Sequence, residues 1–348
     1  MKKFFCLFLI FICFSSCNFE TSQNDTINIE TPEYVFTMSH YFTEKPHVFS
    51  VFPEIHENKI FYCDQYNYVY SNEEDIEGNV FYIDLDKKEE KAINTFSNKL
   101  HFYNNNLYYN KNLSLCKTDI TSGETIQLLS FDMNNLYCFS SGNKNYLVYW
   151  ESNKDYTDIK LYSYNIETNQ TELIGKTNYL TSPYHTFKIR NNHIAYAEKK
   201  GDKYIVYGYN IESKEKLEIL QLSNEPSQMV FDGKIFVWSD KTGTHVFNNG
   251  EDILIGRGTA DVDIFKNRYI FFFENFKIRI YDLYTDKIIY FSEKKYSDTL
   301  FIQWFSLDDT GEKAAFIGID PKLCENIYTD VTFESHPEII FVMDIALK

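Results

Sequence analysis

The sequence predicts an all-β protein, a seven-bladed β-propeller, from three observations. Short runs of β-branched and aromatic residues alternate with clusters of Asn, Asp, Gly and Lys throughout residues 33–348. Helical periodicity is almost absent from the same region. One strand–turn–strand element recurs about every forty residues, a repeat length typical of propeller blades.

The recurring element is an apolar or aromatic strand that ends at Asp or Asn, followed by a turn and a second strand. Short polar side chains at such a position bond to the backbone and open the turn. A further strand with its own turn precedes each copy. The copies are centred on Asp84, Asp119, Asn165, Asn210, Asn248, Asp282 and Asp344. Seven copies predict seven blades, and the shortened fifth copy leaves six blades as the alternative.

The ring has a predicted closure. The seventh copy ends at Lys348, directly after its third strand, so that blade lacks an outer strand. Residues 33–38 (EYVFTM) are strand-like and precede the first complete blade. We expect this segment to complete the seventh blade, which would leave no open edge in the ring.

Two segments resemble a known repeat. They are YDLYTDK from Tyr281 and SLDDTGEKAAF from Ser306. The unit resembles the TolB-type and WD-like propeller repeats of bacterial exported proteins, although Leu307 stands where that pattern has Pro. The resemblance implies the fold and carries little information on function.

The first sixteen residues have the pattern of an export signal. Two lysines precede residues 4–14, which carry no charge, and a membrane-spanning helix needs about 20 apolar residues. The segment Phe14-Ser15-Ser16-Cys17 resembles a bacterial lipoprotein lipobox, with Phe14 in place of Leu. The resemblance implies that residues 1–16 are removed and that Cys17 is lipidated. The alternative is ordinary secretion with Cys17 unmodified.

Residues 17–32 are polar and are expected to form a flexible tether between the lipid and a propeller domain at residues 33–348. The predicted location is therefore the cell envelope, lipid-anchored on the extracytoplasmic side of a bacterial membrane. Fifty acidic against 34 basic residues give a net charge of −16, which argues against nucleic acid as a partner.

Four cysteines follow Cys17: Cys63, Cys116, Cys138 and Cys324. They form no Cys-x-x-Cys pair, and four cysteines permit three disulfide pairings among which the sequence does not choose. Cys63 and Cys116 lie in strand-like runs, so we interpret them as buried free thiols.

The sequence offers no recognised catalytic motif. It contains no HExxH, GxSxG, P-loop or EF-hand spacing, and its four arginines do not match the cluster of sialidase propellers. The run from Ser239 to Gly243 is interpreted as a hairpin loop. We predict no cofactor and no metal site, and we favour a non-enzymatic protein while leaving activity open.

Two long connections are the predicted binding surface. Residues 65–78 and 320–336 join the second and third strands of the first and last blades, which are neighbours across the seam, and long loops on rigid scaffolds often bind ligands. Their aromatic side chains, next to acidic ones, suit a sugar ring or a basic peptide. The candidate residues are Tyr66, Tyr68, Tyr70, Tyr328, Phe333 and His336. The alternative is that the tyrosines only extend a packed hairpin.

The combined expectation is a binding or assembly module for an envelope protein, peptide or glycan, held at a membrane through Cys17. The alternative is an exported hydrolase or lyase that acts on glycans or peptides with residues from several blades.

Overall fold

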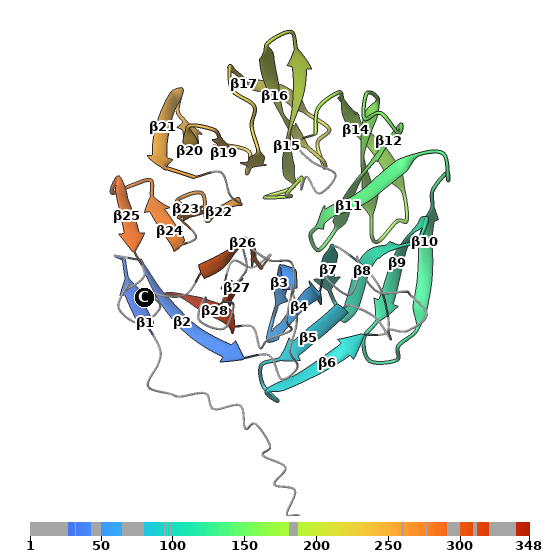
Figure 1. Cartoon of the computed structure of the whole chain (residues 1–348), viewed down its shortest axis with the longest axis horizontal. Helices are drawn as coiled ribbons and strands as arrows, with labels where there is room; N and C mark the ends of the chain where they lie inside the picture. Colours follow the sequence, from blue (N-terminus) through green and yellow to red (C-terminus); the bar gives the residue numbers. More distant parts are fainter. Residues whose placement is uncertain are drawn as a thin grey trace, which may run out of the picture.

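The computed structural model is a ring of seven antiparallel sheets around a central axis (Figure 1). The described residues form no helix. They therefore contain no helix that is long and apolar enough to cross a membrane. The structure describes residues 27–31, 33–42, 50–64, 80–93, 95, 97, 99–180, 187–258, 261–275, 277–290, 300–308, 312–319 and 339–348. The prediction of seven blades is confirmed, and the alternative of six is wrong.

Blades 1 to 3 have four strands each, ordered from the axis outward and called a to d. Blade 1 contains β3 (Ser50–His56), β4 (Lys59–Asp64), β5 (Val80–Asp84) and β6 (Glu89–Ile93). Blade 2 contains β7 (Leu100–Tyr103), β8 (Asn106–Lys111), β9 (Ser114–Asp119) and β10 (Thr125–Ser130). Blade 3 contains β11 (Leu136–Gly142), β12 (Tyr146–Ser152), β13 (Ile159–Asn165) and β14 (Thr171–Thr177).

Blades 4 to 6 continue the ring. Blade 4 has the three strands β15 (His193–Lys200), β16 (Lys203–Asn210) and β17 (Lys216–Leu222). Residues 187–190 take its innermost position and meet β15 through a bridge between Arg190 and His193. Blade 5 contains β18 (Gln228–Phe231), β19 (Phe236–Asp240), β20 (Gly243–Asn248) and β21 (Glu251–Gly256). Blade 6 contains β22 (Val262–Phe265), β23 (Tyr269–Glu274), β24 (Lys277–Asp282) and β25 (Lys287–Tyr290).

Blade 7 joins the two ends of the chain. Its inner strands are β26 (Leu300–Leu307), β27 (Lys313–Ile319) and β28 (Ile339–Leu347), and the fourth is β2 (Tyr34–Phe42). β2 pairs with β28 antiparallel from Tyr34–Leu347 to Phe42–Ile339. The predicted closure of the ring by the N-terminal strand is confirmed.

The prediction of a flexible tether over residues 17–32 does not hold for its last part. Residues 27–30 form a fifth strand, β1 (Ile27–Glu30), which pairs with β2. The cause is a tight turn in which the Thr31 hydroxyl accepts a hydrogen bond from Tyr34 N at 3.0 Å and the Thr31 backbone N donates to Tyr34 O at 2.8 Å. β2 would otherwise present unpaired backbone groups at the outer edge. Residues 1–26, including Cys17, lie outside the described residues.

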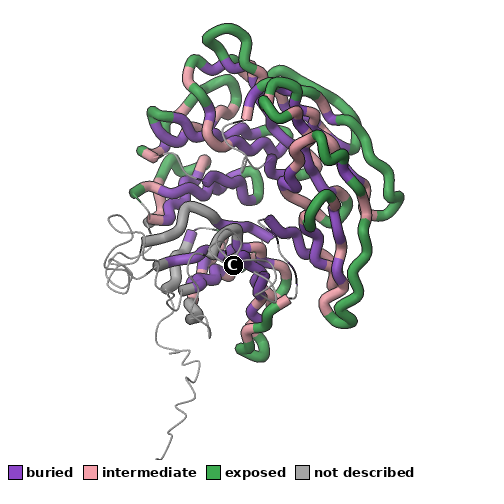
Figure 2. Tube along the Cα trace, turned by 45° about the vertical axis from the view of Figure 1, so that its right-hand side comes forward, coloured by how far each residue is buried: buried purple, intermediate pink, exposed green. Residues whose placement is uncertain are grey.

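Hydrophobic packing links every blade to the next. Seven clusters of buried side chains each combine residues of two neighbouring blades, including the seventh with the first. Buried residues follow the inner strands, and exposed residues follow the outer strands and turns (Figure 2). Because each sheet buries both faces against its neighbours, the ring holds its inner strands in fixed positions around the axis.

The repeated Asp or Asn opens its turn as expected. Asp119 Oδ1 accepts hydrogen bonds from the backbone N of Thr121 and Ser122, at 2.9 and 2.8 Å. Asn165 and Asn210 bond to their turns in the same way. The shortened fifth copy differs because a two-residue hairpin at Asn249-Gly250, both at positive φ, replaces the longer turn.

Three of the four cysteines after Cys17 are described, and Cys63, Cys116 and Cys138 are buried free thiols. The interpretation of Cys63 and Cys116 is confirmed, whereas Cys324 lies outside the described residues. The run from Ser239 to Gly243 forms the β19–β20 hairpin, as predicted.

Candidate functional site at the mouth of the central channel

All seven innermost segments run in the same direction and end in the turns that lead to the second strands. We call the side of the ring where these turns lie the a–b face. A cavity of about 650 Å³ opens there, and we call it the funnel. Every blade contributes to its wall: blades 1 to 7 supply His56, Tyr103, Asn143, Asn191, Asp232, Asn267 and Asp308, in that order.

The funnel owes its polar wall to the chemistry of tight turns. Asn191 and Asn192 in blade 4, and Asn267 in blade 6, line the funnel and have positive φ, a conformation that Asn tolerates better than most residues. Asn143 Nδ2 donates to Asn192 Oδ1 at 3.0 Å, and Asn191 Nδ2 donates to the Oδ1 of blade 6 Asn267 at 3.1 Å. The turns that shape the local backbone therefore also line the funnel with amides.

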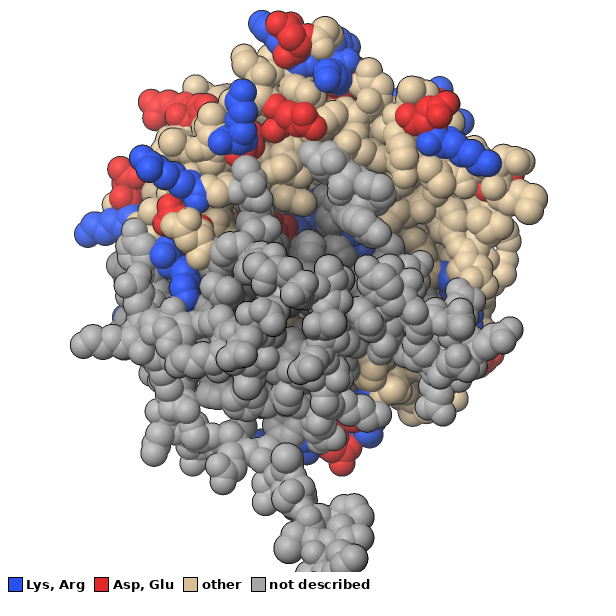
Figure 3. Space-filling view, viewed as in Figure 1, with Lys and Arg blue, Asp and Glu red and all other residues tan. Residues whose placement is uncertain are grey.

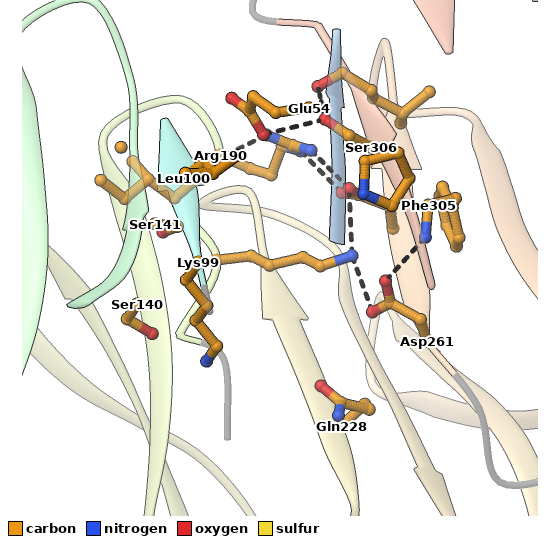
Figure 4. Close-up of a pocket in the computed structure, with 16 residues that line it drawn as sticks. Glu54, Lys99, Leu100, Ser140, Ser141, Arg190, Gln228, Asp261, Phe305 and Ser306 are labelled. Atoms are coloured by element: carbon orange, nitrogen blue, oxygen red, sulfur yellow. Dashed lines mark hydrogen bonds and ion pairs between the residues drawn. The ribbon is translucent and has the colours of Figure 1, made fainter. Parts of the chain in front are cut away.

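A buried ion cluster lies below the funnel, within the channel (Figure 4). The Lys188 Nζ atom of blade 4 lies 2.7 Å from Asp261 Oδ1 and 3.4 Å from Asp263 Oδ2 of blade 6. It also donates to Val262 O at 3.0 Å. The three contacts satisfy the ammonium group, which is what a buried charge requires.

Arg190 binds the same blade. Its Nε donates to Asp263 Oδ1 at 2.6 Å, and its Nη2 donates to Asp263 Oδ2. Burial alone would raise the pKa of Asp263, but the charges of Arg190 and Lys188 outweigh it and hold that pKa below its usual range. Burial raises the pKa of Asp261, which has Lys188 as its charge partner.

A second cluster joins the first three blades to the seventh. Glu54 Oε1 lies 2.9 Å from His101 Nδ1, and the Ser306 hydroxyl donates to Glu54 Oε2 at 3.2 Å. His101 Nε2 lies 3.2 Å from the carbonyl oxygen of Asn143. Both ring nitrogens of His101 therefore face oxygen atoms of other blades.

These side chains fill the middle of the channel. The cavity left between the clusters is about 80 Å³, room for roughly two or three water molecules. Lys99 lies along this cavity with 3% of its surface exposed, and burial lowers its pKa (Figure 4). The funnel thus ends on a polar floor within the channel.

Asp232 is the most unusual group in the funnel wall. It opens the first turn of blade 5, where its Oδ1 accepts hydrogen bonds from Lys234 N at 2.9 Å and Ile235 N at 2.7 Å. Its Oδ2 is buried, and no residue that the structure describes makes a hydrogen bond to it. Burial raises the pKa of this carboxyl.

The charged side chains of the outer surface are arranged differently from the buried ones of the channel. In the view of Figure 3, Lys and Arg side chains lie next to Asp and Glu at the outer turns of the blades. The Lys214–Glu172 contact of 2.7 Å between blades 4 and 3 is an exposed example. Such pairs contribute little to stability and mark no site.

The six predicted binding residues, Tyr66, Tyr68, Tyr70, Tyr328, Phe333 and His336, lie outside the described residues. The strands that flank their loops are described: β4 ends at Asp64 and β27 ends at Ile319. These ends lie on neighbouring blades at the face opposite the a–b face. The binding surface at that face remains a prediction. The funnel at the a–b face was not predicted from the sequence. Its nearest sequence signal was the pairs of asparagines in short turns.

No family model matches the chain, and no curated protein matches it. Solved structures do match. An oligogalacturonate lyase in complex with manganese has 11% identity, covers 92% of this chain and 96% of its own, and has a TM-score of 0.53. An oligogalacturonate lyase from Vibrio parahaemolyticus gives the same values. A puromycin hydrolase S511A mutant complexed with PGG has 8% identity over 78% of this chain and 50% of its own, with a TM-score of 0.54.

The chain is similar to β-propeller proteins. At these identities the likeness extends to the fold alone.

Proposed function

We propose that this protein is a membrane-anchored extracytoplasmic β-propeller that binds a glycan in the funnel. The observation that carries the proposal is a cavity of about 650 Å³ whose wall comes from all seven blades. Ligand sites are concave and largely preformed, and this one lies on a closed, rigid ring.

The wall has the chemistry of a sugar site. Asparagine amides both donate and accept hydrogen bonds, as sugar hydroxyls do. Tyr103 adds an aromatic ring with a hydroxyl group at the wall, supported edge-on by His56 with ring centroids 5.7 Å apart. Lysine, arginine and aspartate side chains all occur in the wall, so its charge is nearly balanced although the chain carries −16. A neutral or weakly anionic ligand fits this balance.

The acids of the channel support binding rather than catalysis as the main role. Asp263 is held by Arg190 and Lys188, and Glu54 contacts His101 and Ser306. Carboxylates fixed in this way serve as a structural floor beneath a ligand.

The proposed anchor orients the funnel. β2 starts at the a–b face, where β28 ends, and β1 runs back along it so that Ile27 lies opposite Met38. β1 therefore begins beside the middle of β2 and runs toward the a–b face. From Cys17 to Ile27 there are ten residues (27 minus 17), which span at most about 35 Å. A lipid on Cys17 would hold the opposite face toward the membrane and leave the funnel open to the surroundings.

Glycan binding is tested with purified protein that starts at Ile27, first on a glycan array and then by calorimetry with each array hit. Tyr103→Ala should weaken binding by roughly tenfold, because an aromatic contact in a pocket carries about that much affinity. Tyr284→Ala is the matched control, since Tyr284 is 69% exposed at an outer turn of blade 6. Equal affinity of both variants and the wild type would exclude the funnel as the glycan-binding site.

The anchor is tested separately with Cys17→Ala in the full chain. The variant should lose lipid labelling and move from the membrane to the soluble fraction, with the unfolding temperature of the propeller unchanged. A Cys17→Ala protein that stays lipid-labelled and membrane-bound would contradict the anchor.

A second candidate function is an exported lyase or hydrolase acting on glycans or peptides. Lys99 favours it, because an amine with a lowered pKa, buried beside the small cavity at the floor of the funnel, suits proton abstraction. Incubation with oligogalacturonate and with peptides, followed by analysis of cleavage products, tests this activity. Cleavage that Lys99→Met abolishes would replace binding as the main function, and cleavage that survives Lys99→Met would assign the reaction to other residues.

A further inference from the structure

A second cavity lies on the a–b face, next to the funnel. It has a volume of about 420 Å³ and lies between blades 6 and 7, and we call it the groove. Its lining comes from the β22–β23 turn, the start of β27 and the paired ends of β2 and β28. Lys266 lines both the groove and the funnel, so the two cavities are neighbours across one lysine side chain.

The walls of the groove are fixed by ring packing and backbone pairing. The ring of Tyr34, which lines the groove, packs edge-on against Phe265 and Tyr269, with ring centroids 5.4 and 5.7 Å apart. Phe265 in turn lines the funnel. On the side of blade 7, Ile345 N donates a hydrogen bond to Glu312 O at 2.7 Å. The groove is therefore preformed and has a fixed position relative to the funnel.

The groove presents both apolar and polar groups at its surface. Leu347 is 73% exposed, and Ala346 beside it is exposed as well. Tyr34 is partly exposed, and no residue that the structure describes makes a hydrogen bond to its hydroxyl group. Lys313 forms an ion pair with Asp344 within the wall. A molecule with both C–H faces and hydroxyl groups matches such a wall, and a sugar ring is of this kind.

The funnel alone is larger than a single sugar unit. Its volume of about 650 Å³ is room for roughly twenty water molecules, and one hexose has fewer non-hydrogen atoms than that. A monosaccharide would leave much of the wall in contact with water. A linear chain can instead fill the funnel with its first units and continue over Lys266 into the groove.

We propose that the groove is a second sugar subsite, so that the ligand is an oligosaccharide chain that starts in the funnel and continues over Lys266 along Tyr34. This inference rests on the proposed function and adds the length of the ligand. The groove carries two lysines and two acids, so a chain without net charge fits it. Linked units also bind more tightly than separate ones, because a chain loses its translational and rotational freedom only once.

The first experiment varies the length of the sugar. Calorimetry measures the affinity of the full chain for cello-, malto-, manno- and chito-oligosaccharides of one to four units. In a series that binds, the affinity should rise by roughly tenfold or more from the monosaccharide to the tetrasaccharide. Equal affinity for both would overturn the second subsite while the proposed function stands. A protein that binds none of these sugars, nor any array glycan, would overturn the proposed function itself.

The second experiment blocks the groove. Ala346→Trp places a large side chain in the groove, and Ala346 does not line the funnel. This variant should lose the additional affinity for the tetrasaccharide and keep the wild-type affinity for the monosaccharide. Ala92→Trp is the matched control, because Ala92 is exposed on the outer strand of blade 1, and it should change neither affinity. Wild-type affinity of a folded Ala346→Trp protein for the tetrasaccharide would overturn the second subsite.

Tyr34→Phe gives a milder test. It keeps the ring that packs against Phe265 and removes only the hydroxyl group. The affinity for the tetrasaccharide should fall by roughly threefold to tenfold, the effect of one hydrogen bond, while the affinity for the monosaccharide stays unchanged. Where Ala346→Trp does not fold, an unchanged tetrasaccharide affinity of Tyr34→Phe would overturn the second subsite instead.

Discussion

Arg190 of blade 4 holds Asp263 of blade 6 by two N–H groups, with Nε 2.6 Å from Oδ1, although blade 5 separates the two in the chain. Asp263 is completely buried. Lys188 and the Asn191–Asn267 amide pair connect the same two blades. Blades 4 and 6 are therefore clamped to each other at the channel, which fixes the width of the funnel on that side.

Arg190→Ala should lower the free energy of unfolding by about 3–5 kcal/mol, because it leaves the buried charge of Asp263 without its main partner. Lys214→Ala, which breaks the exposed pair with Glu172, should cost less than about 1 kcal/mol. Urea unfolding of both variants measures the difference. Similar small losses would show that the clamp contributes no more than a surface pair.

The protein should lose stability in acid below about pH 4. Asp263 and Asp282 are both buried, yet their arginine partners, Arg190 and Arg268, hold their pKa values below the usual range. An acid with a depressed folded pKa stabilises the protein above its unfolded pKa, near 3.9, and this contribution is lost as the pH falls through the folded value.

The pH effect is measured from unfolding midpoints between neutral and strongly acidic pH. Asp282→Asn should flatten the acid limb of that curve, and its effect at pH 7 should exceed its effect at the lowest pH. An acid limb that is unchanged in this variant would contradict the role of Asp282.

The fold could be predicted because its determinants are local. Asp119, Asn165 and Asn210 each bond to the backbone two and three residues on, so their turns recur visibly in the sequence. The closing strand was also visible, since a seventh copy without an outer strand requires a partner from elsewhere. β1 escaped prediction because its only sign was the turn at Thr31, whose meaning depends on a strand edge already being present.

The funnel and its floor could not be predicted for the opposite reason. Lys188 and Asp263 lie 75 residues apart, and nothing near either one signals the other. They meet because the inner strands of different blades converge on one axis. The sequence Asp232-Gly233 predicts an ordinary turn. The burial of the Asp232 Oδ2 atom becomes visible only in the closed ring.

The two N-terminal strands should contribute unequally to stability. A protein that starts at Glu33 loses β1 and the Thr31 hydroxyl contact with Tyr269 at 3.0 Å, and should be slightly less stable than one that starts at Ile27. A protein that starts at Ser39 also loses Phe36 and Met38, which are buried against blade 6. Because each large buried side chain contributes about 2–5 kcal/mol, this truncation should prevent folding or nearly so.

Thermal melts of the three proteins give the comparison. Phe36→Ala in the protein that starts at Ile27 separates the loss of the side chain from the loss of backbone pairing. Equal stability of the proteins that start at Glu33 and Ser39 would refute closure through β2.

Cys63, Cys116 and Cys138 should be inert toward thiol reagents in the folded protein. All three are buried free thiols, and burial raises the pKa values of Cys116 and Cys138, so the reactive thiolate is scarce at neutral pH. Alkylation with iodoacetamide at pH 8, followed by peptide mapping, should leave these three sites unmodified. The same treatment in denaturant should modify all three, and it serves as the control for reagent and recovery. Rapid native alkylation of Cys138, which lies in the inner strand of blade 3, would mean that blade 3 opens toward the channel.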